Sequence, residues 1–473
     1  MFKYDIKLGV APTRRNLFSK EEALRLKAEI YSKLNKMGIS YVDIESVNDE
    51  GLLFGEETIE KVVSKFANAK VDAVFFPHVN FGTEDLVAKV ARALNKPVLI
   101  WGPRDGAPLS DGKRMTDSQC GVFATGKVLR RFKIPFNYLT NCSLNDVAFE
   151  RGINTFLSVA NLVREFKNLR ILQISTRPAD FWTMMCNEGE LLEKFGIQIT
   201  PVPMPDLTKR VKDFKNKKPE KVLQTIDYIK GNMEICVPET AVVTIAALKC
   251  AMQEMAREKG CKAIAIQCWN TLQSEIGIMP CAANGMLTDI GLPVVCETDI
   301  HGAITSIIAQ AASMGRSSTF FADWTVRHTE NNNGELLQHC GPFPISLARG
   351  SKKLVNPFCF PNWPGSVTQE IKPGNLTMLR FDGDNGNYSL LAGKAKIIDG
   401  PFNDGSYGWI EVENWPRLER KIVEGPYVHH CVGIYEDVIP VLFEAERYLQ
   451  LEMDFYDSGA KEKALSWLLA EGI

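Results

Sequence analysis

The chain has 473 residues, of which 45% are hydrophobic and 24% are charged, and 55 basic and 57 acidic side chains give a formal net charge of −2. These values are ordinary for a globular protein with a large core, and the length predicts about three domains. The balanced charge gives no indication of a nucleic-acid or anionic-membrane partner.

Neither a membrane segment nor an export signal is predicted. No apolar run reaches the ~18 residues that a spanning helix requires, and the charged first seven residues do not resemble a signal peptide. The twelve cysteines form no CxxC pair, and several lie inside apolar runs. We therefore expect reduced core thiols in a cytoplasmic protein.

The first part of the chain alternates predicted strands and helices. Ser19 begins a helix as its N-cap, Glu22 completes a capping box, and Gly38 follows the last helical residue, Met37. This order predicts an α/β domain with a doubly wound parallel sheet over residues 1–168. Its strands are expected at 7–11, 41–44, 73–76 and 98–101, and its closing helix at 144–166.

A second α/β domain is predicted over residues 169–325. It repeats the alternation of the first domain and is again expected to be doubly wound and Rossmann-like. Its strands are expected at 169–175, 263–267, 293–296 and 319–322, and its helices at 184–194, 219–230, 239–259 and 300–314.

Residues 326–473 have a different pattern. Turn dipeptides, such as Asp382-Gly383 and Asn385-Gly386, separate β-rich runs. We expect a β-rich C-terminal domain built as an antiparallel sheet or small barrel. Its strands are expected at 376–381, 388–398 and 407–412, and two terminal helices at 439–449 and 461–469.

Glu297 and Asp323 are the strongest candidates for a functional site. Each follows an apolar strand-like run, and a predicted helix joins the two strands. Ligands bind at the carboxyl edge of a parallel sheet, so two hard oxygen ligands there suggest a divalent metal. The alternative is that a strand-end carboxylate caps the next helix, a role for which Asp299 is the better candidate.

Histidines that would complete such a site lie later in the chain. His339 follows Asp323 by 16 residues, and His429 and His430 are adjacent. Neighbours in a strand point to opposite faces, so only one of this pair is expected to face a given pocket. Two carboxylates with an imidazole suit Mn²⁺, Fe²⁺ or Co²⁺. The alternative for each histidine alone is an ordinary core or surface side chain.

The segments Cys296–Ala303, Phe321–Asp323 and His429–Cys431 resemble the L-fucose isomerase and L-arabinose isomerase superfamily, and most closely its L-fucose isomerase-like branch. The resemblance covers most of the chain and agrees with the predicted order of two α/β domains and a β-rich domain. Further agreement lies in residues 9–15, 177–178, 187–191 and 267–269.

The resemblance implies a Mn²⁺-dependent aldose–ketose isomerase, with Co²⁺ or Mg²⁺ as other possible metals. It implies Glu297, Asp323 and His430 as metal ligands. His339 falls where the arabinose enzymes carry a further histidine near the metal. It also implies a homohexamer with active sites at subunit interfaces. Glu297 and Asp323 are expected to be the acid/base pair that moves a proton between C2 and C1, in an order that the sequence leaves open.

Several other residues are expected to contact the sugar. Trp269 and Trp101 lie at the ends of predicted strands, where aromatic rings can pack against a sugar, with core packing as the alternative. Three arginines near strand ends are further candidates for sugar contacts, with solvated surface charges as the alternative: Arg14, Arg15 and Arg177. His78 and Asn80 are two more polar candidates.

The natural substrates to expect are L-fucose, D-arabinose, L-arabinose or a sulfonated 6-deoxyglucose, which an additional cation in the pocket would favour. Two other classes stay open: a non-catalytic sugar-binding protein, and a metal-dependent aldolase or hydrolase. The chain has no GxGxxG after a strand, no P-loop and no GxSxG motif.

Overall fold

The computed structural model describes residues 4–470, which form two compact units. The barrel unit comprises Glu165–Ile439 and Leu451–Ala460. The N-terminal unit comprises Tyr4–Arg164, Pro440–Gln450 and the residues from Lys461 onward. The division into domains at residues 168 and 325 stays a prediction.

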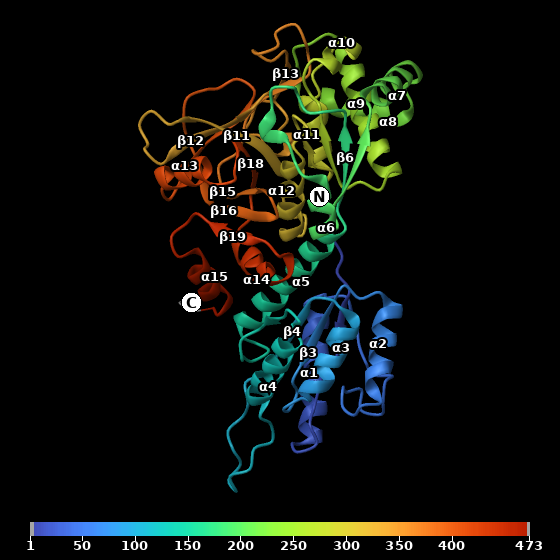
Figure 1. Ribbon diagram of the computed structural model, residues 1–473, viewed down its shortest axis with the longest axis vertical. Helices are drawn as coiled ribbons and strands as arrows, with labels where there is room; N and C mark the ends of the chain where they lie inside the picture. Colours follow the sequence, from blue (N-terminus) through green and yellow to red (C-terminus); the bar gives the residue numbers. More distant parts are fainter. Residues whose placement is uncertain (1–3, 471–473) are drawn as a thin grey trace. The chain divides into compact units, whose positions relative to one another are not determined.

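The N-terminal unit is built on a five-stranded parallel sheet with the order β2-β1-β3-β4-β5 (Figure 1). Ser19 caps α1 as predicted, because its side chain accepts a hydrogen bond of 3.1 Å from the Glu22 amide. Gly38 follows the helix with a φ of +67°, which glycine adopts freely. The strands are β1 (Leu8–Val10), β2 (Tyr41–Val42), β3 (Ala73–Pro77), β4 (Val98–Trp101) and β5 (Asn137–Tyr138).

The helices of this unit come from both ends of the chain. Near the C-terminus, α14 (Ile439–Leu449) places the Tyr448 hydroxyl 2.8 Å from the Asn137 Oδ1 that accepts its hydrogen bond. The others are α1 (Lys20–Lys36), α2 (Thr58–Ala69), α3 (Glu84–Leu94), α4 (Ser118–Arg131), α5 (Val147–Lys167), which ends in the barrel unit, and α15 (Ala460–Leu468).

The barrel unit contains a second parallel sheet, with the order β10-β9-β6-β7. This confirms the second doubly wound α/β element. Its strands are β6 (Arg170–Ile174), β7 (Gln198–Val202), β9 (Ala263–Ile266) and β10 (Val294–Val295). Its helices are the short η1 (Trp182–Met184), α6 (Glu188–Phe195), α7 (Met204–Lys217), α8 (Glu220–Asn232), α9 (Glu239–Glu258), α10 (Thr271–Ile276), α11 (Cys281–Asp289) and α12 (Ile300–Ala312).

A six-stranded antiparallel barrel forms the rest of this unit, as predicted. Strands follow the order β16-β15-β18-β11-β12-β17, and pairing between β16 and β17 closes the barrel. They are β11 (Thr319–Arg327), β12 (Gly334–His339), β15 (Asn375–Asp384), β16 (Asn387–Ile398), β17 (Ser406–Val412) and β18 (His430–Ile434). The remaining elements are β8 (Glu234–Ile235), β13 (Lys353–Val355), β14 (Ser366–Glu370), β19 (Glu452–Phe455), η2 (Ile345–Leu347) and α13 (Trp415–Glu424).

The predicted position of Asp323 at the edge of a parallel sheet is wrong. Asp323 lies within β11, a barrel strand, where it is opposite Gln338 of β12 and His430 of β18. The apolar run before Asp323 is typical of a strand buried on both faces, which is also the pattern of a parallel strand. The sequence therefore shows a strand but not the sheet to which it belongs.

Helix α12 joins the second parallel sheet to the barrel. Every residue from Ile300 to Ala312 is buried, and the helix packs against β9 and β10 as well as β15 and β18. A helix that is buried on all sides is typical of such an enclosed position. The buried α12 therefore fixes the end of β10 against the barrel.

Within residues 4–470, no helix combines the length and the apolarity needed to cross a membrane.

Candidate metal centre

Glu297 lies in the tight turn between β10 and α12. Glu297 and Thr298 have φ angles of +51° and +58°, a strained conformation for residues other than glycine. The Thr298 amide donates to the Ile266 carbonyl at 3.1 Å, and its hydroxyl donates to the Thr176 carbonyl at the same distance. The turn thereby holds the Glu297 side chain in the interior, where it is 3% exposed.

The barrel supplies a carboxylate and two imidazoles to the same place. His430 Nε2 lies 3.4 Å from Asp323 Oδ1 and 3.7 Å from Glu297 Oε2. His339, at the end of β12, has its Nε2 3.5 Å from the same Glu297 oxygen. The structure therefore brings together all four residues that the sequence analysis nominated for the metal.

The buried oxygens of this group fit a cation. Glu297 Oε2 and Asp323 Oδ1 are buried and have no hydrogen-bond partner among residues 4–470. Buried polar atoms nearly always have partners, so two orphaned carboxylate oxygens facing imidazole nitrogens indicate a shared ligand. Glu297, His339 and His430 place one ligand atom each within 4.8 Å of one another, and a second such group comprises Asp323, His429 and His430. Oxygen and imidazole donors of this kind suit a divalent transition metal.

The carboxylates and the imidazoles of the group stabilise each other's charged forms. Burial alone would raise the pKa of Glu297, but His339 and His430 outweigh it and lower that pKa. Burial likewise disfavours charged His339, but the carboxylates of Asp323 and Glu297 raise its pKa to about 9. Without a metal, a protonated His339 balances the buried negative charge.

Asp299 orients His430 from behind. Its Oδ2 lies 2.9 Å from His430 Nδ1, and its Oδ1 accepts a 2.9 Å hydrogen bond from the Gly302 amide, which confirms Asp299 as the cap of α12. Burial opposes ionisation, but Arg380 and His430 hold the pKa of Asp299 far below its usual range. An ionised Asp299 accepts the Nδ1 proton, which leaves Nε2 of His430 free for a metal.

Arg380 extends this arrangement and was missed in the sequence analysis. It is 1% exposed, pairs with Asp299, and donates from Nε to Asp382 at 2.8 Å. Asp382 Oδ1 in turn lies 2.9 Å from His301 Nδ1. An arginine inside the apolar strand segment Met378–Phe381 was the available signal, because a charge in a buried strand requires partners.

The expectation that only one histidine of the adjacent pair faces the site is wrong. His429 and His430 have ring centroids 4.2 Å apart, and each offers a nitrogen to the group around Asp323. Strand alternation does not apply because β18 begins at His430, so that His429 precedes the regular strand.

An open pocket of about 370 Å³ adjoins this group. His429 and Trp324 line it, and Trp324 follows Asp323 directly. Its size lies within the range of small-molecule sites. Asp323 has a side chain that is 26% exposed, against 4% for Glu297 and 1% for His430, so it is the most accessible of these three groups.

Two of the predicted sugar contacts, Trp269 and Arg177, lie in loops of the barrel unit. Trp269 is half-buried and makes edge contacts with Phe181 and Phe360, at centroid distances of 5.1 and 5.7 Å. Phe181 is also 6.5 Å from His429, which connects Trp269 to the candidate centre. Arg177, in the loop after β6, is half-buried and donates to the nearby carbonyls of residues 178 and 179.

The predicted contacts in the N-terminal unit are occupied by internal partners. Arg14 binds both oxygens of Glu50, Arg15 pairs with Glu84, and Asn80 accepts from the Arg15 amide at 2.9 Å. These residues gather where β1 and β3 end, next to each other in the sheet.

The other two predicted contacts of this unit are fully buried. His78 Nε2 lies 2.7 Å from the Thr125 hydroxyl, and burial lowers the pKa of His78 to about 4. Trp101 packs edge-on against Phe149 at 4.9 Å, so for Trp101 the structure shows the core-packing alternative.

Comparisons with known proteins show what this chain is similar to. Residues 9–167 match the family described as fucose/sulfoquinovose isomerase, N-terminal domain. A sulfoquinovose isomerase of Alkalicoccus urumqiensis is 27% identical over 80% of this chain and 85% of its own. Those of Priestia aryabhattai and a Clostridium species are 23% and 22% identical, over 91% and 80% of this chain and 95% and 85% of their own.

Similarity to solved structures adds nothing to this comparison. An ABC transporter solute-binding protein from Burkholderia multivorans is 10% identical, with a TM-score of 0.16 over 66% of this chain and 96% of its own. A score that low carries no structural argument. The domain match assigns residues 9–167 to the fucose/sulfoquinovose isomerase family, and relatives that match at least 80% of this chain carry the name sulfoquinovose isomerase.

Proposed function

We propose that the protein converts a 6-sulfonated aldohexose of the sulfoquinovose type into its 2-ketose, at a manganese centre held by Glu297, Asp323 and His430. The orphaned oxygens of the two carboxylates, which face His430 Nε2, carry this proposal. The relatives that bear the name sulfoquinovose isomerase support the choice of sugar. L-Fucose and D-arabinose are the next substrates to test.

The reaction moves a proton from C2 to C1 of the open-chain sugar. A bound divalent cation would supply Lewis-acid stabilisation of the negative charge that develops on the sugar oxygens. The lowered pKa of Glu297 keeps its carboxylate ionised near neutral pH, so that it can accept a proton. Asp323 is the more accessible carboxylate and is placed to exchange a proton with the sugar. The two together form the acid/base pair of the proposal.

Burial of the other groups strengthens their electrostatic effect on the reaction. Glu297, His339 and His430 are at most 4% exposed. Electrostatic interactions are stronger where water is excluded. His339 would act as a fourth ligand or as a charge partner of Glu297, from which its Nε2 is 3.5 Å away.

Arg177 is our candidate for binding the sulfonate of the substrate. It is half-buried, and no carboxylate of the described residues lies within ion-pair distance of it. Its loop contacts the strained turn of the metal centre, because the Thr298 hydroxyl donates to the carbonyl of Thr176. A half-buried guanidinium without an acidic partner suits an anionic substituent of the substrate. Trp269 would provide an aromatic wall beside the sugar.

The experiment is a panel of sugars in D₂O with Mn²⁺, followed by NMR. We expect ketose formation and deuterium incorporation to be fastest with sulfoquinovose, and Glu297→Gln to abolish both. Glu370→Gln makes the same substitution in the same unit at an ion pair with Arg349, outside the centre, and should retain activity. Faster turnover of L-fucose or D-arabinose would correct the substrate, and full exchange by Glu297→Gln would refute the site.

Assembly, metal identity and location complete the proposal. We propose a homohexamer, tested by light scattering, and Mn²⁺ in preference to Co²⁺ or Mg²⁺, tested by reconstitution of the metal-free protein. The twelve cysteines form no disulfide within residues 4–470, in keeping with a reducing cytoplasm, where fractionation should find the protein.

A further inference from the structure

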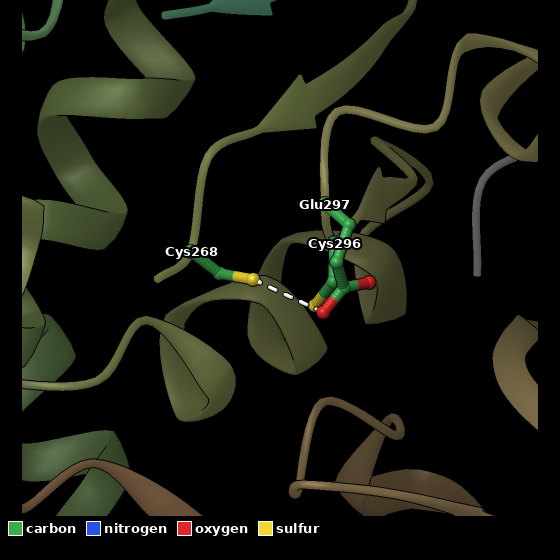
Figure 2. A group of neighbouring side chains, drawn as sticks. All are labelled: Cys268, Cys296 and Glu297. Carbon is green, nitrogen blue, oxygen red and sulfur yellow. Dashed lines mark hydrogen bonds between the residues drawn. The ribbon is translucent and has the colours of Figure 1, made fainter. Parts of the chain in front are cut away.

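Two buried thiols lie beside Glu297, and one of them contacts the carboxylate oxygen that does not face the histidines. Cys268 follows β9, and Cys296 follows the neighbouring parallel strand β10. The Cys268 thiol donates to Glu297 Oε1 at 3.3 Å, and the two sulfurs and one carboxylate oxygen all lie within 4.8 Å of one another. Figure 2 shows the Cys268 thiol directed at the carboxylate, with the Cys296 sulfur beside it. All three residues are at most 3% exposed.

Two amide side chains around these thiols also lack partners for their oxygens. Asn284 donates to Cys296 Sγ at 3.6 Å, and Gln273 donates to the Cys268 carbonyl at 2.8 Å. Both are nine-tenths or more buried, and the side-chain oxygen of each has no hydrogen-bond partner in the described part of the chain. These amide groups adjoin the two thiols, and their orphaned oxygens are a further sign that the polar groups of this region are not fully satisfied.

The donor set selects a different class of metal from the first centre. Two sulfurs with oxygen donors suit a thiophilic, tetrahedral cation such as Zn²⁺ or Cd²⁺, whereas Mn²⁺ prefers oxygen and imidazole. Glu297 belongs to both groups, because its Oε1 contacts Cys268 and its Oε2 faces His339 and His430.

We propose that Cys268, Cys296 and Glu297 form a second metal site, which binds a thiophilic divalent cation and thereby inhibits the enzyme. Binding releases one proton from each thiol to solvent and forms two metal–sulfur bonds and one metal–oxygen bond. A carboxylate that donates electrons to this cation is a weaker base toward the sugar. The inhibition rests on the proposed isomerase function, whereas the binding site does not.

Cadmium titration of the whole protein tests the site without reference to activity. We expect a thiolate-to-cadmium charge-transfer absorption that saturates with one bound ion. Cys268→Ser and Cys296→Ser should each weaken it by at least about tenfold, since even outer-shell changes at metal sites have effects of this size. Cys250→Ser alters another buried thiol of the same unit, in α9, and should leave the absorption unchanged. Absorption that survives in the Cys268 and Cys296 variants would overturn the proposal.

A second measurement covers the case in which these variants do not fold. X-ray absorption of the wild-type protein with one equivalent of Cd²⁺ should report two sulfur neighbours together with oxygen. A shell of oxygen and nitrogen alone would place the cadmium in the histidine centre and refute the thiol site.

Inhibition is then measured separately, with each variant compared with its own uninhibited rate. Zn²⁺ should reduce turnover of the manganese-loaded wild type reversibly, and Cys268→Ser should need about ten times more Zn²⁺ for the same fractional loss. Cadmium–sulfur binding without isomerase activity on any sugar would refute the proposed function and leave the site intact. Isomerase activity without cadmium–sulfur binding would refute only the second site.

Discussion

Asp299 Oδ2 lies 2.9 Å from Nδ1 of His430, so one carboxylate both begins α12 and orients a candidate metal ligand. The two roles use different oxygens, because Oδ1 accepts the Gly302 amide. The start of a wholly buried helix is thereby connected to a barrel strand, and any shift of α12 would move the imidazole.

Replacing Asp299 by Asn should separate these roles. Asparagine caps a helix as well as aspartate, so α12 should persist. It cannot supply the negative charge that fixes the His430 proton, and outer-shell changes of this kind lower metal affinity about 10–100-fold. Calorimetric titration with Mn²⁺ measures the loss. Asp437→Asn changes a surface ion pair with Lys394 in the same unit and serves as the control. Equal affinities for both variants would contradict the role of Asp299.

Removing the metal should destabilise the barrel unit. Glu297 and Asp323 bring two carboxylates close to each other, and their orphaned oxygens gain a partner only when a cation binds. At a free metal concentration of 100 times Kd, binding to the folded state adds about 2.7 kcal/mol to stability. We expect EDTA to lower the thermal midpoint of the wild type, and to do so much less in Asp323→Asn. Identical melting curves with and without EDTA would be inconsistent with the site.

Arg177→Met should discriminate between sugars. Hydrogen bonds to a charged group contribute about 1.5–3 kcal/mol, so loss of the guanidinium should raise KM for a sulfonated hexose by about tenfold or more. The KM for a neutral aldose should change little, and Arg177→Lys should recover part of the loss because it restores the charge without the planar fork. Steady-state kinetics on both sugars provide the measurement. An equal rise for both would assign Arg177 a structural role instead.

Glu335 should make stability depend on pH. Burial raises the pKa of Glu335 from 4.5 to about 7, partly opposed by Arg327. The folded state therefore holds this proton more tightly than the unfolded chain. The contribution of Glu335 to the free energy of unfolding is fully present below pH 4.5 and is lost as pH rises through about 7. This loss amounts to about 3 kcal/mol.

Glu335→Gln removes this titration. Its thermal midpoint relative to that of the wild type should therefore rise between pH 5 and pH 8, which calorimetry can follow at both values. Glu411→Gln, at an exposed position on β17, should show no such trend. A constant difference between wild type and Glu335→Gln at both pH values would contradict the raised pKa.

Local signals in the sequence predicted much of the fold. Ser19 and Asp299 were recognised as caps because a cap depends on a few neighbouring residues, and both structural caps agree. Helix 439–449 was predicted at its observed bounds. The metal group itself was nominated from Glu297 and Asp323 with the later histidines, and the resemblance selected His430 from the adjacent pair.

What the tertiary structure decided is how distant strands pair. Asp323 is opposite His430, more than a hundred residues later, in a barrel rather than at a parallel edge. Arg380 could be placed beside Asp299 only once β15 lay against α12. The reason is physical: a strand's alternation and capping residues are local properties of the chain, whereas its neighbours are selected by long-range pairing and the burial that follows. The sequence by itself therefore determined which elements form and which residue types could bind a metal, and the pairing of β11 with β18 decided where those residues meet.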